Sequence, residues 1–216
     1  MVPRESTEKT EEFVCNCQST LANRRPKPNS SHSGLASQVS VKDIEQDEKQ
    51  YMPHIGKPLN RERLEALYRW KNQMRLSEKK RHSVERYYIG QLEKLQQLPP
   101  TIDPATFLGT FKGGAIWRIF LLHCWSPSEY PIYDQHVHRA MTFIRGKPRE
   151  EIAGWSDQKK INAYLGKYIP FFNSFGAHDQ RMVDRALWVL GRFIKTTRFP
   201  DVVTQGYGRS ANHDLV

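Results

Sequence analysis

The sequence predicts an all-α fold. Apolar side chains recur at steps of three and four residues through most of the stretch between residues 51 and 195, which is the spacing of one face of a helix. Residues that commonly cap helices stand just before these apolar runs, and glycine or proline follows several of them. The alternating apolar and polar pattern of a half-buried strand is absent from the sequence.

The first fifty residues are predicted to be a flexible polar arm. Residues 1–50 contain one aromatic residue, Phe13, and residues 23–40 are rich in serine, proline, asparagine and arginine. Such a composition buries too little apolar surface to offset the entropy lost on ordering the chain. We therefore expect one helical domain over residues 51–216, with a short acidic helix near residues 43–48 leading into it.

Two helices are expected at the start of this domain. Asn60 is the expected N-cap of the first, whose apolar stripe reaches Met74. Ser77 starts the second, in which apolar residues continue at helical steps until Pro99 and Pro100 end it.

The middle of the chain predicts two helices joined by a tight turn. Asp103 followed by Pro104 is an N-cap with proline at the first helical position, so a short helix should run to about Thr110. Gly113-Gly114 then predicts a turn, and the apolar segment 115–125 predicts a buried helix.

After a proline-containing loop, Asp134 occupies an N-cap position. The helix that follows should cover residues 135–145 and end at Gly146.

Two further helices are expected before an irregular tail. Ser156 caps the first, which should reach about Tyr168 because Pro170 follows. The second covers residues 179–195, and the tail after Phe199 reads as irregular.

The composition excludes several classes of protein. The mean hydropathy is −0.70, and no apolar run approaches the roughly 18 residues that a membrane-spanning helix needs. The charged segment from Met1 to Phe13 lacks the apolar stretch of a secretory signal. The three cysteines are too few for a disulfide framework or a four-cysteine iron–sulfur site. We expect a cytoplasmic protein with no membrane partner.

Basic residues predominate in the predicted helical domain. The chain has 33 lysine and arginine residues against 23 aspartate and glutamate residues, a formal net charge of +10. Residues 1–50 hold seven basic and eight acidic residues, so residues 51–216 carry +11. This excess indicates a polyanion partner, most often nucleic acid. A helical scaffold that binds an acidic protein is the alternative that charge alone leaves open.

Two short segments indicate a more specific chemistry. The first, FLGTFKGGA at residues 107–115, is a glycine-rich turn between two predicted helices. Such a turn lets backbone N–H groups approach a phosphate, and a helix N-terminus adds a partial positive charge. The second, YPIYDQHVHR at residues 130–139, is a proline-containing loop that ends in a carboxylate at a helix start.

In this order, the two segments resemble the helix–hairpin–helix DNA glycosylases over residues 107–139. The family pattern is roughly L-P-G-V-G-x-K-x-A, a helix, and then P-x-x-D-x-H-V-x-R. The matching residues are Gly109 and Ala115 in the first part and Pro131, Asp134, His136, Val137 and Arg139 in the second.

The hairpin departs from the family pattern at two positions. The second glycine of the pattern is Phe111 here. Gly113 stands where family members with lyase activity carry a lysine that forms a Schiff base, and Lys112 is one residue out of register. The family's C-terminal iron–sulfur cysteines are also missing.

The resemblance implies that Asp134 is the catalytic carboxylate. Breaking an N-glycosidic bond builds positive charge on the deoxyribose, which a carboxylate can stabilise while it orients or deprotonates a water. The dipole of the following helix favours the ionised form. Because no hairpin lysine is in register, water is the expected nucleophile. An ordinary N-cap is the competing interpretation of Asp134.

The hairpin is expected to bind phosphates of double-stranded DNA without reading its sequence. The residues expected to do so are Gly109, Thr110, Lys112, Gly113 and Gly114. The resemblance allows a structural monovalent cation at the hairpin, and no other cofactor is expected. No metal site is expected either, because His136 and His138 lie about 200° apart around a helix.

Aromatic side chains near the catalytic loop are the expected walls of a pocket for a flipped base. Tyr133 and Tyr130 flank the loop and are the candidates. Trp117 and Trp125 are interpreted as core residues, and Arg139 is expected to pair with a carboxylate or a carbonyl.

The sequence therefore predicts a monomeric DNA glycosylase that flips a damaged or modified base and hydrolyses its bond to deoxyribose, leaving an abasic site. Base-excision repair in the host and defence against modified phage DNA are both open. The alternative is a non-catalytic helix–hairpin–helix module that binds DNA and releases no base.

Overall fold

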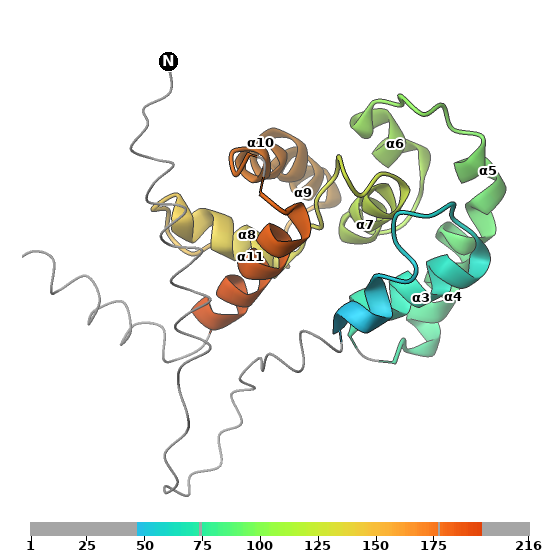
Figure 1. Cartoon of the computed structure of the whole chain (residues 1–216), viewed down its shortest axis with the longest axis horizontal. Helices are drawn as coiled ribbons and strands as arrows, with labels where there is room; N and C mark the ends of the chain where they lie inside the picture. Colours follow the sequence, from blue (N-terminus) through green and yellow to red (C-terminus); the bar gives the residue numbers. More distant parts are fainter. Residues whose placement is uncertain (1–46, 74, 177, 196–216) are drawn as a thin grey trace, which may run out of the picture. The chain divides into compact units, whose positions relative to one another are not determined.

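The structure is a computed structural model that describes residues 47–73, 75–176 and 178–195 (Figure 1). These residues form helices and contain no strand, which confirms the all-α prediction. The helices are α3 (Arg61–Asn72), α4 (Glu78–Tyr87), α5 (Leu92–Gln96), α6 (Pro104–Thr110), α7 (Ala115–Trp125), α8 (Gln135–Ile144), α9 (Asp157–Ala163), α10 (Ile169–Asn173) and α11 (Gln180–Ile194). Within the described residues, no helix is long and apolar enough to cross a membrane.

The chain divides into two compact units. The described part of one unit comprises residues 135–151 and 185–195, and that of the other comprises residues 47–73, 75–134, 152–176 and 178–184. We call them the smaller and the larger unit. Residues 1–46 of the predicted arm and the predicted tail lie outside the described residues.

The core of the larger unit is aromatic. The Tyr68 ring stacks with the rings of Tyr88 and Trp117, at centroid distances of 4.9 and 5.4 Å, and Phe120 meets it edge-on. Helix α7 is buried on nearly every side, and it contacts both α6 and α9 (Figure 1). An all-round apolar helix of this kind has to lie inside a protein, as the sequence predicted for residues 115–125.

Side-chain caps fix where the helices of this unit begin. Asn60, Ser77, Asp103 and Ser156 each accept a hydrogen bond from a backbone N–H in the first turn of the helix that follows. Each such cap stabilises its helix by about 1 kcal/mol. The caps at Asn60, Asp103 and Ser156 were predicted from the sequence and are confirmed. For Ser77 the sequence predicted only that a helix starts there, and the structure adds the cap.

The single long helix predicted after Ser77 is wrong. Helix α4 ends at Tyr87, a 3₁₀ turn covers Ile89–Gln91, and α5 follows. Tyr88 leaves the helical region at φ −130° and ψ −60°, and its ring packs on Tyr68. Burial of this ring in the core overrides the helical spacing of the sequence.

The helix from Ser156 also does not end before Pro170 as predicted. A π-helical stretch, Tyr164–Tyr168, joins α9 to α10, and Pro170 lies in the first turn of α10. The N–H of Ile169 donates to the carbonyl of Tyr164. Proline is tolerated in a first helical turn because its missing N–H is not needed there.

In the smaller unit, α8 and the described C-terminal part of α11 approach each other closely. A Cβ added at Gly191 would overlap the backbone of His136. The buried Arg139 guanidinium donates to both carboxylate oxygens of Glu151, at 3.0 and 2.8 Å, and to the Gly191 carbonyl. The pairing expected of Arg139 is confirmed, and its hydrogen bonds lower the pKa of Glu151 to about 2.

Candidate functional site

The hairpin between α6 and α7 is a tight turn of four residues, 111–114. Gly113 adopts φ +101°, and a Cβ at this position would overlap the hydroxyl of Tyr88. A side chain here would therefore be strained by its backbone and would also displace a core tyrosine. The turn thus excludes a lysine at the position where the resembling family carries one.

The predicted DNA-binding residues differ in their exposure. Gly109, Lys112 and Gly114 are exposed, whereas Thr110 and Gly113 are half-buried. The Thr110 hydroxyl donates to the Thr106 carbonyl, so its hydrogen is used inside α6. Gly114, the N-cap of α7, supplies no capping side chain to the first turn of that helix.

Two further elements, α5 and α4, lie beside the hairpin. Lys94 of α5 donates to the Thr110 carbonyl at 3.1 Å, and its ammonium lies 5.7 Å from the centre of the Phe111 ring. Tyr87, at the end of α4, lies next to Gly113. Helix α4 exposes four basic side chains, which are Lys79, Lys80, Arg81 and Arg86. The hairpin therefore has positive charge next to it.

Asp134 directly precedes α8 and forms an ion pair that joins distant parts of the chain. Lys71, in the last turn of α3, donates to the Asp134 carboxylate at 3.0 Å. The Lys71 side chain is 11% exposed and the Asp134 side chain is 17% exposed. Both are largely buried, but solvent can still reach them. The Lys71 ammonium also lies 5.7 Å from the centre of the Phe120 ring.

A second carboxyl group, that of Asp184 on α11, lies within electrostatic range of this pair. Burial raises the pKa of Asp184 to about 6; the positive charges of Arg181 and Lys71 oppose the shift, and the Asp134 carboxylate adds to it. Arg181 donates to one Asp184 oxygen and to Glu48. The other Asp184 oxygen is buried and has no hydrogen-bond partner among the described residues.

The two tyrosines predicted to hold a base occupy different environments. Tyr133 is fully buried, with its ring 5.5 Å from that of Tyr164 and 5.1 Å from that of Tyr168. Tyr130 is partly exposed, and its carbonyl lies 2.6 Å from the buried His123. In this conformation Tyr133 supports the Asp134 loop from within the core, and Tyr130 keeps a surface that a ligand can reach.

The two histidines after Asp134 contact different residues. The His136 ring packs edge-on against Trp188 and approaches Arg139, whereas His138 is buried 3.6 Å from Glu150. The described residues hold no group of three or more side chains suited to a metal ion.

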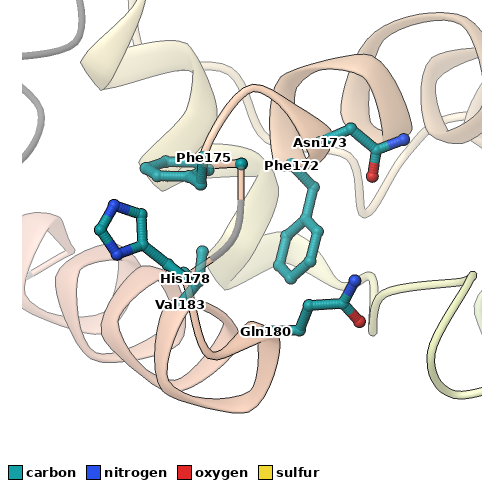
Figure 2. A pocket seen from close by; sticks show the side chains of 7 residues that line it. Phe172, Asn173, Phe175, His178, Gln180 and Val183 are labelled. Atoms are coloured by element: carbon teal, nitrogen blue, oxygen red, sulfur yellow. The ribbon is translucent and has the colours of Figure 1, made fainter.

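A separate hollow of about 200 Å³ lies between the end of α10 and the start of α11 (Figure 2). Its lining residues include the rings of Phe172 and Phe175 together with His178 and Gln180. No lysine, arginine, aspartate or glutamate is among its lining residues, so it lacks an ion pair like that of Lys71 and Asp134.

Comparison of the chain with protein-family models, with curated proteins and with solved structures gives no match.

Proposed function

We propose that this chain is a DNA glycosylase that acts on double-stranded DNA and leaves an abasic site. The observation that carries the proposal is Asp134, a reachable carboxylate paired with Lys71. Asp134 follows the glycine-rich hairpin in the order of the helix–hairpin–helix glycosylases. The Lys71 ammonium lies 3.0 Å from the carboxylate and holds it in place.

Asp134 would act at the sugar. As the bond between base and deoxyribose breaks, positive charge builds up on the sugar, and a carboxylate beside it lowers the energy of that state. The same carboxylate can orient a water for attack from the face opposite the base. No sequence-specific contact is needed for this step, because the base is chosen when it is flipped out of the duplex.

The hairpin and α4 would hold the DNA backbone. The exposed Lys112 and the four exposed basic side chains of α4 supply charge, and the glycine turn brings backbone N–H groups close to a phosphate. Contacts of this kind give affinity for any duplex.

The proposal is tested by the release of bases from DNA. Wild type and Asp134→Asn are incubated with bacterial, oxidised and alkylated DNA and with glucosylated-hydroxymethylcytosine phage DNA, and free bases are identified by mass spectrometry. We expect release by the wild type and a loss of about 100-fold or more in the variant. Asp157→Asn is the matched control, because it removes a carboxylate from another ion pair, that with Arg118. Equal release by wild type and Asp134→Asn contradicts the mechanism.

A non-catalytic DNA-binding module is the second candidate. It is favoured by Phe111, which replaces a hairpin glycine of the pattern and is buried with its ring 5.1 Å from that of Phe107. This candidate predicts DNA binding that weakens steeply with salt and no abasic product from any substrate. The base-release assay separates the two functions.

A further inference from the structure

Helix α4 carries a serine that follows a pair of basic residues. Lys80 and Arg81 stand three and two positions before Ser83, and the apolar Val84 comes directly after it. No other serine or threonine in the sequence has basic residues at both of these positions. Protein kinases choose their serines by the pattern of charge around them. Paired basic residues followed by a serine and an apolar residue form the pattern that one class of kinases selects.

The serine lies on the surface, in a part of α4 that buries little. Residues 78–83 of the helix include no buried side chain, and Val84 is the first one. The Ser83 hydroxyl donates to the Lys79 carbonyl at 3.0 Å. A lysine of this stretch also donates to the Asn72 side chain at 2.9 Å. Because so little apolar surface is buried here, this end of the helix opens locally at a low cost in free energy, and the hydroxyl then becomes available to a kinase.

A phosphate on this serine would lie between two cations of the same helix face. Ser83 lines a hollow along α4 together with Glu78, Lys79, His82, Arg86 and Tyr87. Lys79 precedes the serine by four residues and Arg86 follows it by three, and these are the spacings at which side chains meet on a helix. A phosphoserine carries a charge of about −1.5 to −2 at pH 7 and forms strong hydrogen bonds with such cations.

This face of α4 ends beside the hairpin. Tyr87, four residues after Ser83, lies next to Gly113. Lys79 and Arg86 are two of the cations that would hold the DNA backbone in the function proposed above. A phosphate between them neutralises their charge and repels the phosphates of DNA.

We propose that Ser83 is a phosphorylation site for a serine kinase that recognises basic residues, and that its phosphate blocks the binding of DNA to α4 and the hairpin. The modification site does not depend on the proposed function, whereas the effect of the phosphate rests on it.

The transfer uses ATP as the phosphate donor. The Ser83 hydroxyl oxygen bonds to the γ-phosphorus, the bond from that phosphorus to the β,γ-bridging oxygen breaks, and ADP leaves. The hydroxyl proton passes to the catalytic carboxylate of the kinase and from there to solvent.

Ser77, the nearest serine, is less suited to this modification. Arg75 stands two positions before it, but the residue three positions before it is Met74. The Ser77 side chain also accepts a hydrogen bond from the backbone N–H of Lys80 and so caps α4. The phosphate is therefore expected on Ser83 and not on Ser77.

The test of the site incubates the full chain with ATP, Mg²⁺ and the catalytic subunit of cyclic-AMP-dependent protein kinase, which selects serines that follow paired basic residues. Mass spectrometry of peptides locates the phosphate. We expect it on Ser83 in the wild type, no phosphate at this position in Ser83→Ala, and an initial rate about tenfold lower in Arg81→Gln. Arg69→Gln, which removes an exposed arginine from α3, is the matched control and should keep the wild-type rate.

The effect of the phosphate is measured by fluorescence anisotropy of a labelled DNA duplex with the unmodified and the phosphorylated chain. We expect phosphorylation to weaken binding by about tenfold or more at low salt and to reduce the slope of log K against log salt by about 2, because two cations are neutralised. Ser83→Ala treated with the same kinase and ATP should bind DNA as it does before treatment.

Three results would overturn the site: no phosphate on Ser83 of the wild type, phosphate mainly on another residue, or an equal rate in Arg81→Gln. Full phosphorylation of Ser83 with unchanged affinity for DNA would overturn its effect. If the unmodified chain binds no duplex, the proposed DNA function fails, while a phosphate mapped to Ser83 leaves the modification site standing.

Discussion

The Asp184 carboxyl is buried, yet it lies among three other charged groups. Arg181 donates to one of its oxygens, and the charges of Lys71 and Asp134 also act on it. Burial disfavours the ionised form more than the two cations favour it, so the pKa of Asp184 rises from 3.8 to about 6. Because Asp184 changes its charge near pH 6, the net charge of the groups around Asp134 depends on pH.

This raised pKa predicts how stability depends on pH. Below pH 3.8 the group is protonated in both the folded and unfolded chains. Between pH 3.8 and about 6 the unfolded chain loses this proton while the folded chain keeps it, so the free energy of unfolding falls as the pH rises. Asp184→Asn should remove a decrease of about 3 kcal/mol across this interval.

The measurement is urea unfolding of wild type and Asp184→Asn at about pH 3.5 and about pH 7, chosen to lie outside the interval. Comparing the change between the two pH values cancels whatever part of the loss in Asp184→Asn does not depend on pH. Asp157→Asn, whose side chain is 46% exposed, is the control and should follow the wild type. A difference between wild type and Asp184→Asn that stays the same at both pH values would show that burial does not govern this group.

The sequence could indicate Asp134 but not its neighbours. Asp134 stands in a ten-residue segment whose order is recognisable, and a carboxylate before a helix is a local signal. Lys71 lies 63 residues earlier and reads as one of several basic residues in an amphipathic helix. Asp184 follows Val183 in the last helix and reads as an ordinary polar position. Only folding brings these three residues together.

At the scale of elements, local signals predicted helix starts better than helix ends. The four N-caps depend on contacts within four residues, which the sequence contains in full. The break at Tyr88 depends on a ring that packs on Tyr68, twenty residues earlier. The chain stays helical past Pro170 because a π-helical stretch joins α9 to α10. The spacing of apolar residues does not predict such a stretch. Tertiary packing decided both positions.

Helix α4 and the hairpin together predict a salt-dependent contribution to DNA binding. Tyr87 brings the end of α4 against Gly113, and Arg86 lies 5.5 Å from the Tyr87 ring. If Lys79, Arg86 and Lys112 each contact one phosphate, replacing any of them with glutamine should reduce the slope of log K against log salt by about 1. The loss should be similar for unrelated DNA sequences, because phosphate contacts carry no sequence information.

Fluorescence anisotropy of a labelled duplex over a range of salt concentrations gives these slopes. Lys57→Gln is the control, since Lys57 is exposed and donates to the carbonyl of Pro53, in the segment before α3. An unchanged slope in all three test variants would place the DNA on another surface.

At the scale of the whole molecule, composition predicts where the helical domain begins, and the described residues begin close to that point. The predicted boundary at residue 50 comes from the scarcity of aromatic residues before it. The described structure begins at Asp47, and residues 47–51 are helical. Glu48 pairs with Arg181, whose guanidinium lies 4.3 Å from the centre of the Tyr51 ring. The sequence predicted a short acidic helix that includes Glu48, but a contact made across 133 residues leaves no trace in local composition, so Arg181 could not be predicted as its partner.

This contact predicts different outcomes for two N-terminal deletions. Removing residues 1–46 should leave the free energy of unfolding and the base-release activity unchanged, because that segment is poor in apolar residues. Removing residues 1–50 takes Glu48 from Arg181 beside the Asp184 carboxyl and should cost about 1–3 kcal/mol. Urea unfolding of both deletion variants, with Glu48→Gln in the full chain as the matched substitution, measures the effect. Equal destabilisation by the two deletions would mean that the folded part begins before Asp47.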